Sequence, residues 1–535
     1  MKKAFFSGIL ILLFTGSSAQ APSILWTFDV KAPSFGQAAM GDIDNDQLPE
    51  IVFSTYMNDG MIYALNAEDG SLLWEYSTGD CNDAAPLITD ADGDGKPDVI
   101  LASSCVPKTF CFEGATGELK WLTPTGGTDS PPSAGDVDND GKPEILHGEF
   151  NGGVICLNGE DGSVAWELII DPNASIQTSP ALLDVDGNNQ LDFVVANWSY
   201  TNTNRIWAFR GDNRQQIWVN TDPTDLIYHG AAFGDIDGDG MPELSFGCYD
   251  NNVYVLNAED GSLKWSFNMG AYNYVGGPTV MADVDNNGSY EILAAGWYKM
   301  KAIRANGTEK WNYNIPDYAS CFRGPAVSDI NGDGFLDLVF GTSEGKVIAL
   351  NGNDGSWLWT LDLAAHYGDT LDIDHAPVIG DFDGDGDLDG FVVGGFTDYP
   401  NIGNDYGRAY AFTLGNGTHP DWRMFQHDTA RSSCVPLDWA TGISQLPSIA
   451  GSFLVFPDPF SDELTIRIQA PVKGRISFDL LSVDGRILKT YIADSARDVN
   501  ESLCWKNAGT GLSPGLYLLR MTASNRTGTV RVIRK

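Results

Sequence analysis

The nine residues 235–243, DIDGDGMPE, are one of eight copies of the pattern D-x-[DN]-x-[DN]-x-x-x-[DE] in this chain. Neighbouring copies are roughly 50 residues apart along almost the whole chain, and such a regular period indicates a repeat fold. The copies begin at Asp42, Asp90, Asp136, Asp184, Asp235, Asp283, Asp329 and Asp381.

A second pattern, which ends in tryptophan, alternates with the first. Its clearest copies are YALNAEDGSLLW ending at Trp74, CLNGEDGSVAW ending at Trp166 and YVLNAEDGSLKW ending at Trp265. Weaker copies end at Trp121, Trp218, Trp311, Trp359 and Trp422.

The spacing of the two patterns predicts four short strands in each repeat. In the seventh repeat these are 325–329, 338–341, 346–350 and 357–361. Four-stranded units of this length, repeated radially, are typical of β-propeller blades, so the fold class is all-β with eight blades. Trp26, in the segment 24–30, is a ninth copy of the tryptophan strand and is expected to complete the last blade and close the ring.

The acidic loops predict calcium sites, because calcium prefers six to eight oxygen ligands from carboxylates, amides and carbonyls. We expect up to eight Ca²⁺ ions, held by side chains at positions 1, 3, 5 and 9 of each loop. These residues are Asp42, Asp44, Asp46 and Glu50; Asp90, Asp92, Asp94 and Asp98; Asp136, Asp138, Asp140 and Glu144; Asp184, Asp186, Asn188 and Asp192; Asp235, Asp237, Asp239 and Glu243; Asp283, Asp285, Asn287 and Glu291; Asp329, Asn331, Asp333 and Asp337; Asp381, Asp383, Asp385 and Asp389.

An EF-hand is excluded, since that motif requires a glutamate at position 12 and flanking helices. Position 12 holds apolar residues or, in the third loop, His147. Three or four carboxylates in one short loop repel one another without a cation. The alternative is a set of polar turns in which turn geometry favours aspartate.

These residues resemble FG-GAP (VCBS-type) repeats, the calcium-loop propellers of integrin α-subunit heads. The resemblance covers roughly residues 34–425, and the segment 233–240, FGDIDGDG, is close to the pattern of that family. The tryptophan segments are also similar to quinoprotein-type propeller repeats. The chain has no adjacent cysteine pair, a frequent feature of the quinone-binding enzymes, and this weakens a cofactor interpretation.

Both ends of the chain predict export. Lys2, Lys3 and the apolar run 4–14 read as a signal peptide over residues 1–19. The propeller is expected over 20–435, a linker over 436–450 and a smaller domain over 451–535. That last region, with segments such as VFPDPF (455–460), resembles the type A sorting domain of the type IX secretion system, a small β-sandwich. The resemblance implies the type IX machinery as a partner and a secreted or outer-membrane location in a Gram-negative bacterium, while an ordinary accessory β-sandwich is the alternative.

Charge narrows the choice of partners. The chain has 72 acidic and 32 basic residues, for a formal net charge of −40. This excess argues against nucleic acids and anionic membrane surfaces as partners. No stretch of the mature chain is long and apolar enough to be a transmembrane helix. Among the eight cysteines, Cys105 and Cys111 form the best local disulfide candidate.

The blade connections should alternate between two faces, with the acidic loops on one of them. An aromatic residue recurs after the strand that follows six of the eight acidic loops, while Ser104 and Ser343 interrupt the series; Trp198, Tyr249 and Trp297 are the candidate ligand-binding members. These rings are suited either to stacking on sugars or to packing between blades. In the link 364–375, His366, Asp372, Asp374 and His375 are candidates for a catalytic or metal site, with exposed loop residues as the alternative.

The sequence favours a binding or adhesion scaffold for a glycan or an extracellular protein. It shows no nucleophile elbow, zinc motif or phosphate loop, and no catalytic residue is assigned. A lyase-like, polysaccharide-degrading enzyme on a calcium propeller is the alternative function, and a quinoprotein dehydrogenase is a more distant one.

Overall fold

The structure is a computed structural model. It describes residues 22–79, 81–188, 190–201, 204–239, 241–415 and 417–422, and in the C-terminal region 453–456, 463–468, 476–481, 487–493, 502–506, 510, 515–523 and 526–534. The chain divides into two compact units, Met1–Val435 and Pro436–Lys535. The predicted signal peptide and the predicted linker 436–450 lie outside the described residues, so both stay predictions.

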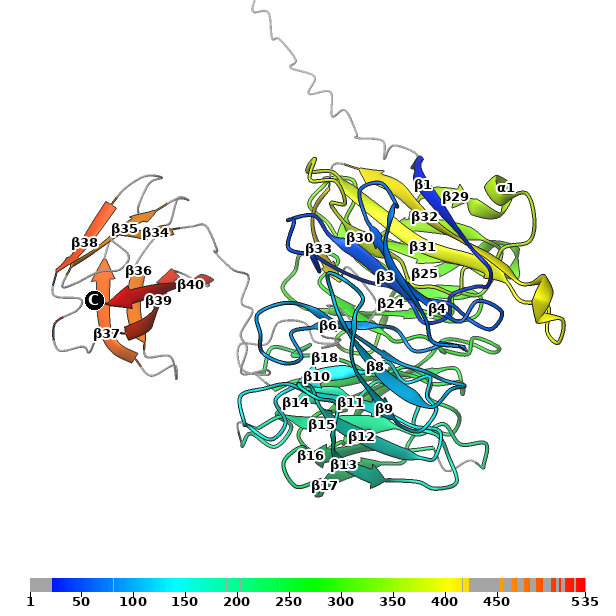
Figure 1. The fold of residues 1–535 in the computed structure, drawn as a ribbon, viewed down its shortest axis with the longest axis horizontal. Coiled ribbons are helices and arrows are strands. Elements are labelled where there is room, and N and C mark those ends of the chain that lie inside the picture. Colours follow the sequence, from blue (N-terminus) through cyan, green and yellow to red (C-terminus); the bar gives the residue numbers. More distant parts are fainter. Residues whose placement is uncertain are drawn as a thin grey trace, which may run out of the picture. The chain divides into compact units, whose positions relative to one another are not determined.

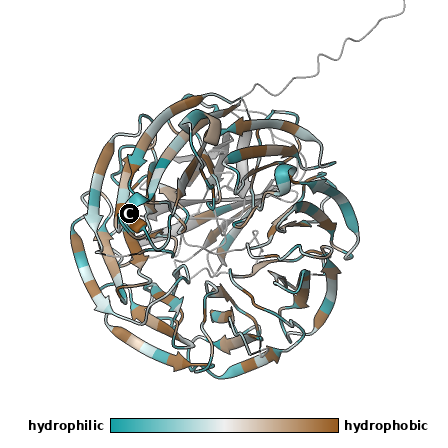
Figure 2. Cartoon of the chain, turned by 90° about the vertical axis from the view of Figure 1, so that its right-hand side faces the viewer, coloured by the Kyte–Doolittle hydropathy of each residue, from teal (hydrophilic) through white to brown (hydrophobic). Residues whose placement is uncertain are grey.

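The first unit is an eight-bladed β-propeller, which confirms the predicted fold class (Figures 1 and 2). Each blade is an antiparallel sheet whose strands run in sequence order from the innermost to the outermost, except in the last blade. The strands of blades 1 to 4 are β2 (Ala39–Gly41), β3 (Glu50–Ser54), β4 (Met61–Asn66) and β5 (Leu72–Ser77); β6 (Leu87–Thr89), β7 (Asp98–Ala102), β8 (Lys108–Glu113) and β9 (Leu119–Pro124); β10 (Ser133–Gly135), β11 (Glu144–Gly148), β12 (Gly153–Asn158) and β13 (Val164–Ile169); β14 (Ala181–Leu183), β15 (Asp192–Ala196), β16 (Ile206–Arg210) and β17 (Gln216–Asn220).

Blades 5 to 8 continue the ring. Their strands are β18 (Ala232–Gly234), β19 (Glu243–Gly247), β20 (Asn252–Asn257) and β21 (Leu263–Asn268); β22 (Val280–Ala282), β23 (Glu291–Ala295), β24 (Lys299–Arg304) and β25 (Glu309–Asn314); β26 (Ala326–Asp329), β27 (Asp337–Gly341), β28 (Lys346–Asn351) and β29 (Trp357–Asp362); β30 (Val378–Gly380), β31 (Leu388–Phe396), β32 (Tyr406–Gly415) and β1 (Ile24–Val30). In the described residues the helices are short: η1 (Pro316–Tyr318), α1 (Leu363–Tyr367) and η2 (Ile402–Asn404).

The first and last parts of the propeller meet in one sheet. Strand β1 pairs with β32 and takes the outermost place in the eighth blade, with Trp26 opposite Ala411. This confirms the expectation that the segment around Trp26 closes the ring. Trp422, read from the sequence as the end of a weak tryptophan strand, lies instead in β33 (Thr418–Trp422), which pairs with β26 of the seventh blade.

Tryptophans of the outer strands tie several blades to the next one. The indole nitrogens of Trp74, Trp121 and Trp218 donate hydrogen bonds of 2.7 to 2.8 Å to main-chain carbonyls of Gly114, Gly159 and Ala258 in the following blade. Between the blades lie buried aliphatic and aromatic side chains of the second and third strands, such as Phe53, Phe193 and Phe340. The hydrophobic core is therefore a ring of interfaces between neighbouring sheets.

The second unit contains two antiparallel sheets in its described residues. One has the order β34 (Phe453–Phe456), β35 (Glu463–Ile468) and β38 (Ser502–Lys506). The other has the order β37 (Ile487–Ala493), β36 (Ile476–Leu481), β39 (Gly515–Ala523) and β40 (Arg526–Arg534). Two sheets are what a β-sandwich requires, but the sandwich arrangement itself stays a prediction.

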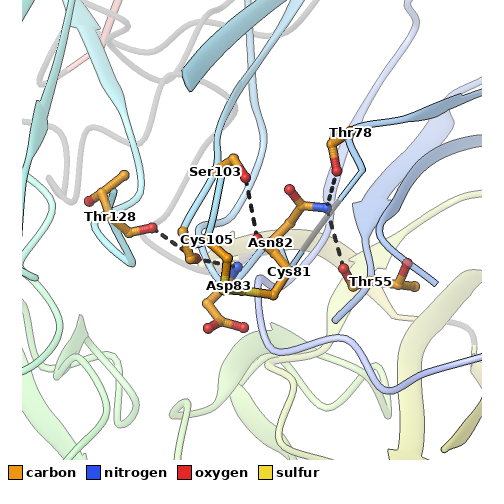
Figure 3. The surroundings of a disulfide bond; sticks show 9 residues. Thr55, Thr78, Cys81, Asn82, Asp83, Ser103, Cys105 and Thr128 are labelled. Carbon is orange, nitrogen blue, oxygen red and sulfur yellow. Dashed lines mark hydrogen bonds between the residues drawn. A yellow bond between two sulfur atoms is a disulfide. The ribbon is translucent and has the colours of Figure 1, made fainter. Parts of the chain in front are cut away.

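The disulfide differs from the sequence expectation. Cys105 pairs with Cys81, 24 residues earlier, and not with Cys111 (Figure 3). Cys111 is a buried free thiol in β8, where its side chain packs in the core. The disulfide joins the link that precedes the second blade to the turn between β7 and β8. In the described part of the chain no helix is long and apolar enough to cross a membrane.

Candidate metal centres and ligand-binding face

The acidic loops all occupy the same place in the propeller. Each loop joins the innermost strand of its blade to the second strand, and no helix flanks it in the described residues. In seven blades the residue at position 9 begins the second strand, as Glu50 begins β3. The structure therefore brings the predicted side chains of each loop together at one end of its blade.

The side chain at position 1 shapes the turn. In the third loop, Asp136 Oδ1 accepts the amide hydrogen of Asp140 at 3.1 Å, and Oδ2 accepts that of Gly141 at 3.0 Å. Asp140 Oδ1 in turn accepts the amide hydrogen of Lys142 at 2.9 Å. Equivalent bonds recur around the ring, for example from Gln47 and Leu48 in the first loop. Some of the carboxylate oxygens therefore accept the main-chain hydrogen bonds of a polar turn, which is the alternative interpretation of these aspartates.

The acid at position 9 is deeply buried in every loop. One oxygen of Glu144 accepts the amide hydrogen of Val137 at 2.9 Å, and Glu50 makes the same bond to Ile43 at 2.7 Å. The Glu144 side chain is only 2% exposed. A carboxylate in such a place needs a compensating charge to stay ionised.

Carboxylate oxygens of one loop converge closely enough to share an ion. Three carboxylates offer oxygens within 4.8 Å of one another in each of the first five loops. Burial and, next, neighbouring aspartates raise the pKa of Glu50 and Glu144 to about 7. In the seventh loop, burial followed by Asp333 and Asp329 raises the pKa of Asp337 to about 8.

Several loop oxygens have no hydrogen-bond donor. Oδ1 of Asp90 and Oδ1 of Asp285 are buried and accept no hydrogen bond. Converging hard oxygen atoms without donors fit a divalent cation that prefers carboxylates and carbonyls. Side chains at positions 1, 3, 5 and 9 would hold such an ion. Calcium in these loops remains a prediction.

The opposite ends of the strands carry an aromatic cluster that includes the three predicted ligand-binding residues. Trp198 contacts Tyr228 and Tyr249, with ring centroids 5.0 and 5.3 Å apart. Tyr249 contacts Tyr274 at 5.9 Å, and Tyr274 contacts Trp297 at 4.9 Å. These rings are partly exposed although they touch across neighbouring blades. Both interpretations made from the sequence, stacking and packing between blades, are therefore compatible with their position.

Beside this cluster, eight equivalent residues, four of them acids or amides, surround the propeller axis on the same face. The side chain four residues before each innermost strand is partly exposed, except where glycine takes the position. The set is Phe35, Asp83, Asp129, Gln177, Tyr228, Gly276, Phe322 and Asp374. We call these residues the axial ring. The sequence of one link alone does not identify its axial-ring residue. An alignment of the eight links on the innermost strands that follow them could have identified all eight.

Arg323, which follows the axial-ring residue Phe322 in the sequence, lies near the three acids of the axial ring. Arg323 Nε donates to Asp374 Oδ1 at 3.1 Å, its Nη1 donates to His229, and its guanidinium lies 5.4 Å from the centre of the Tyr228 ring. Burial, and next the negative charge of Asp129, raises the pKa of Asp83 well above its usual value. Burial also raises the pKa of Asp129.

The four candidate residues of the link 364–375 differ in exposure and in their partners. His366 is exposed on α1. Asp374 is bound to Arg323, His375 is 1% exposed, and Asp372 bridges to Gly395 through the main chain. The interpretation as exposed loop residues is therefore wrong for His375, whose main chain continues into the innermost strand of the eighth blade.

Comparisons with known proteins identify two regions of the chain. A model of the FG-GAP-like repeat matches residues 90–147, 184–246 and 329–392. A model of the secretion system C-terminal sorting domain matches residues 454–535. A lambda-carrageenase of Pseudoalteromonas sp. is 34% identical over 110 residues, which are 20% of this chain and 11% of that enzyme. A beta-alanine-activating enzyme of Drosophila melanogaster is 23% identical over 49% of this chain and 26% of its own. The chain thus spans a small part of the length of these relatives.

Solved structures share the fold at low sequence identity. The Vibrio cholerae biofilm matrix protein Bap1 is 15% identical, with a TM-score of 0.55, over 89% of this chain and 97% of that one. A europium-containing methanol dehydrogenase is 12% identical, with a TM-score of 0.53, over 74% of this chain and 93% of its own. At these identities the likeness shows the propeller fold alone.

Proposed function

Since this chain is a secreted or cell-surface protein built from FG-GAP-like repeats and a secretion-system sorting domain, we propose that it is a calcium-stabilised propeller that binds extracellular polysaccharide. The observation that carries the proposal is the partly exposed aromatic cluster around Trp198, Tyr249 and Trp297. Flat aromatic rings offer apolar area with a defined orientation, which suits the faces of sugar rings. Calcium, when bound, supplies positive charge that holds the acidic loops together.

The axial ring gives this surface its polar groups. Carboxyl groups of Asp83, Asp129 and Asp374 form hydrogen bonds with sugar hydroxyls, and Arg323 pairs with Asp374. Because acids outnumber the single guanidinium, the charge favours a neutral over a sulfated polysaccharide. The partial match to lambda-carrageenases supports a polysaccharide over a protein ligand.

The test is retardation of the full-length protein in native gels that contain agarose, a neutral galactan, lambda-carrageenan, a sulfated galactan, or laminarin, a neutral glucan. Retention in at least one gel is expected, with Trp198→Ala and Trp297→Ala each weakening it about tenfold at unchanged thermal midpoint. The matched control is Trp357→Ala, since Trp357 is 58% exposed and lies on the outermost strand β29, away from the cluster. No retention in any gel, or unchanged retention with lowered midpoints, contradicts the proposal and favours packing between blades.

A polysaccharide-degrading enzyme is the second candidate function. The pair Asp83 and Asp129 favours it, because burial raises the pKa of both acids and so favours the protonated form, which can pass its proton to a leaving oxygen. New reducing ends without ultraviolet absorption indicate hydrolysis, and new reducing ends together with the ultraviolet absorption of unsaturated sugars indicate a lyase. Product formation that Asp83→Asn abolishes, while gel retention persists, is the result that distinguishes an enzyme from a binding module.

A further inference from the structure

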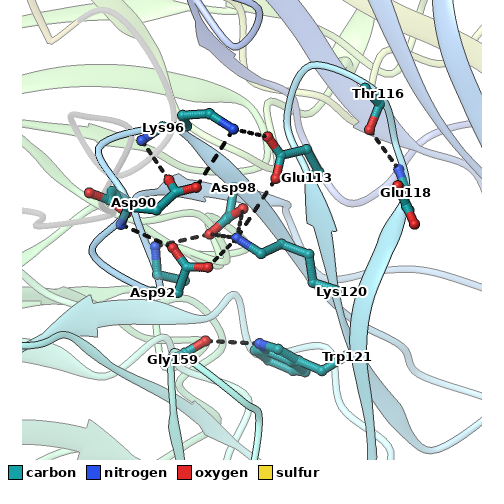
Figure 4. Close-up of polar contacts among 12 residues, drawn as sticks. Asp90, Asp92, Lys96, Asp98, Glu113, Thr116, Glu118, Lys120, Trp121 and Gly159 are labelled. Atoms are coloured by element: carbon teal, nitrogen blue, oxygen red, sulfur yellow. Dashed lines mark hydrogen bonds and ion pairs between the residues drawn. The ribbon is translucent and has the colours of Figure 1, made fainter.

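In four of the eight acidic loops, a lysine or arginine from a later strand of the same blade contacts the loop carboxylates. In the second loop, Lys120 Nζ lies 2.6 Å from Asp92 Oδ2 and 2.8 Å from Asp98 Oδ1 (Figure 4). In the fifth loop, Lys264 Nζ lies 2.5 Å from Asp237 and 2.7 Å from Glu243. These ammonium groups contact positions 3 and 9, the same carboxylates that would hold a metal ion.

The sixth and fourth loops repeat this arrangement. Lys310 Nζ contacts Asp285 and lies 3.4 Å from Glu291, and its side chain is only 5% exposed. Arg210, at the end of β16, places Nη2 2.5 Å from Asp186 Oδ2. In all four blades the base comes from the third or fourth strand, so that the sheet itself aims it at the loop.

The other four loops have an apolar residue where the lysines stand. Lys120, Lys264 and Lys310 each precede the tryptophan of their outermost strand, and the equivalent residues of the first, third, seventh and eighth blades are Leu73, Ala165, Leu358 and Leu25. Within the described residues, no basic side chain lies within 4.0 Å of the side chain at position 1, 3, 5 or 9 in any of these four loops. The negative charge of these side chains is therefore not compensated by an ion pair within the protein.

We propose that the eight loops form two classes: the loops that begin at Asp42, Asp136, Asp329 and Asp381 bind a divalent cation tightly, and the other four bind it weakly because a tethered lysine or arginine occupies their carboxylates. The inference rests on the proposed function, in which the loops bind calcium. An ion that enters a loop of the second class must displace a partly buried ammonium or guanidinium, and a unit positive charge a few ångströms away repels it. We expect at least about tenfold weaker binding in that class.

The test is calcium titration of the chelator-treated, full-length protein by isothermal calorimetry and equilibrium dialysis. Four tight ions per chain are expected for the wild type and five for Lys264→Met. Lys142→Met is the matched control, because Lys142 lies in a loop of the first class but pairs with Glu160 outside it, at 2.8 Å. It should still bind four ions.

Each remaining result has a distinct meaning. Eight equivalent tight ions in the wild type, or an unchanged count in Lys264→Met, overturn the two classes while supporting calcium binding. Absence of calcium binding overturns the proposed calcium loops as well. If Lys264→Met is unstable when metal-free, the calcium-induced rise of its thermal midpoint is compared with that of the wild type, and a rise no larger than the wild-type rise counts against the proposal.

Discussion

The indole Nε1 of Trp26 donates a hydrogen bond of 2.7 Å to the main-chain oxygen of Ala67, which lies 41 residues later in the first blade. Trp26 belongs to the outermost strand of the eighth blade, so this bond joins the last blade to the first. Gly70, whose φ of 71° suits a residue without a side chain, leaves room for the ring, since a Cβ there would collide with Trp26. The bond repeats at the ring closure the contact that other outer-strand tryptophans make between successive blades.

Loss of this bond should weaken the closed ring. Trp26→Phe keeps an aromatic ring but removes the donor and leaves the Ala67 carbonyl without it, so we expect a loss of about 1 kcal/mol in the free energy of unfolding of the propeller. Urea denaturation of wild type and variant measures the loss. Trp357→Phe is the control, because the Trp357 indole bonds only to Thr360 on an exposed strand. Equal stability of Trp26→Phe and wild type would contradict a closing role for the bond.

Removal of calcium should destabilise the propeller through mass action. An ion that binds only the folded chain adds about 2.7 kcal/mol per site at a hundredfold excess over its dissociation constant. We expect a chelator to lower the thermal midpoint by several degrees. Glu144→Gln, which removes one buried charge of the third loop, should reduce the shift, whereas Asp161→Asn, in an exposed turn where Asp161 accepts from Ser163, should not. Identical calorimetric scans with and without chelator would exclude tightly bound structural calcium.

The disulfide should stabilise the face that carries the axial ring. It joins residues 24 apart, close to Asp83, whose amide donates to Ser104 Oγ at 3.1 Å (Figure 3). Closing a loop of this length is worth about 3 kcal/mol in the chain-entropy account. The double variant Cys81→Ser with Cys105→Ser should lose about this amount in urea denaturation. Reductant should lower the stability of the wild type to a similar level and leave the double variant unchanged; a wild type that is insensitive to reductant would contradict a stabilising disulfide.

The periodic features of the sequence predicted the fold, and the non-periodic contacts escaped prediction. The strands expected in the seventh repeat agree with β26 to β29 to within one residue, because turn glycines and acidic loops mark every strand end. Ring closure by Trp26 followed from the same repeat. The pairing of Cys105 with Cys81 did not, since it depends on how a link folds back on the next turn.

For the candidate sites too, local features were predicted from the sequence and long-range contacts were not. Loop ligands were assigned from spacing within nine residues, a range over which the chain itself brings side chains together. Next to the axial ring, Arg323 contacts His229, 94 positions away in the sequence, and only the closed ring of blades brings the two residues together. The basic side chains of the second class of loops were missed for a similar reason, since Lys264 reaches Glu243 across the sheet, 21 residues away.

A buried histidine predicts how the protein responds to acid. His147, on β11, is fully buried; its Nδ1 donates to the Gly148 oxygen at 2.9 Å, and its Nε2 lies 2.8 Å from the Thr109 hydroxyl. Burial lowers the pKa of His147 to about 4. In the unfolded chain the histidine takes up a proton near pH 6.5, so the unfolded state binds more protons between these values. The stability that depends on neutral His147 is therefore complete above about pH 6.5 and is lost as the pH falls towards 4.

The size of this effect is about 3 kcal/mol, from 1.36 kcal/mol per unit of pKa difference. His147→Gln keeps polar atoms near Thr109 but does not titrate, so its free energy of unfolding should fall less steeply between pH 7 and pH 4. Urea denaturation of both proteins over this range, with the difference between them plotted against pH, isolates His147 from the carboxyl groups that both share. Parallel curves would mean that His147 gains its proton in the folded state as easily as in the unfolded one. That result would contradict the prediction that burial lowers the pKa of His147.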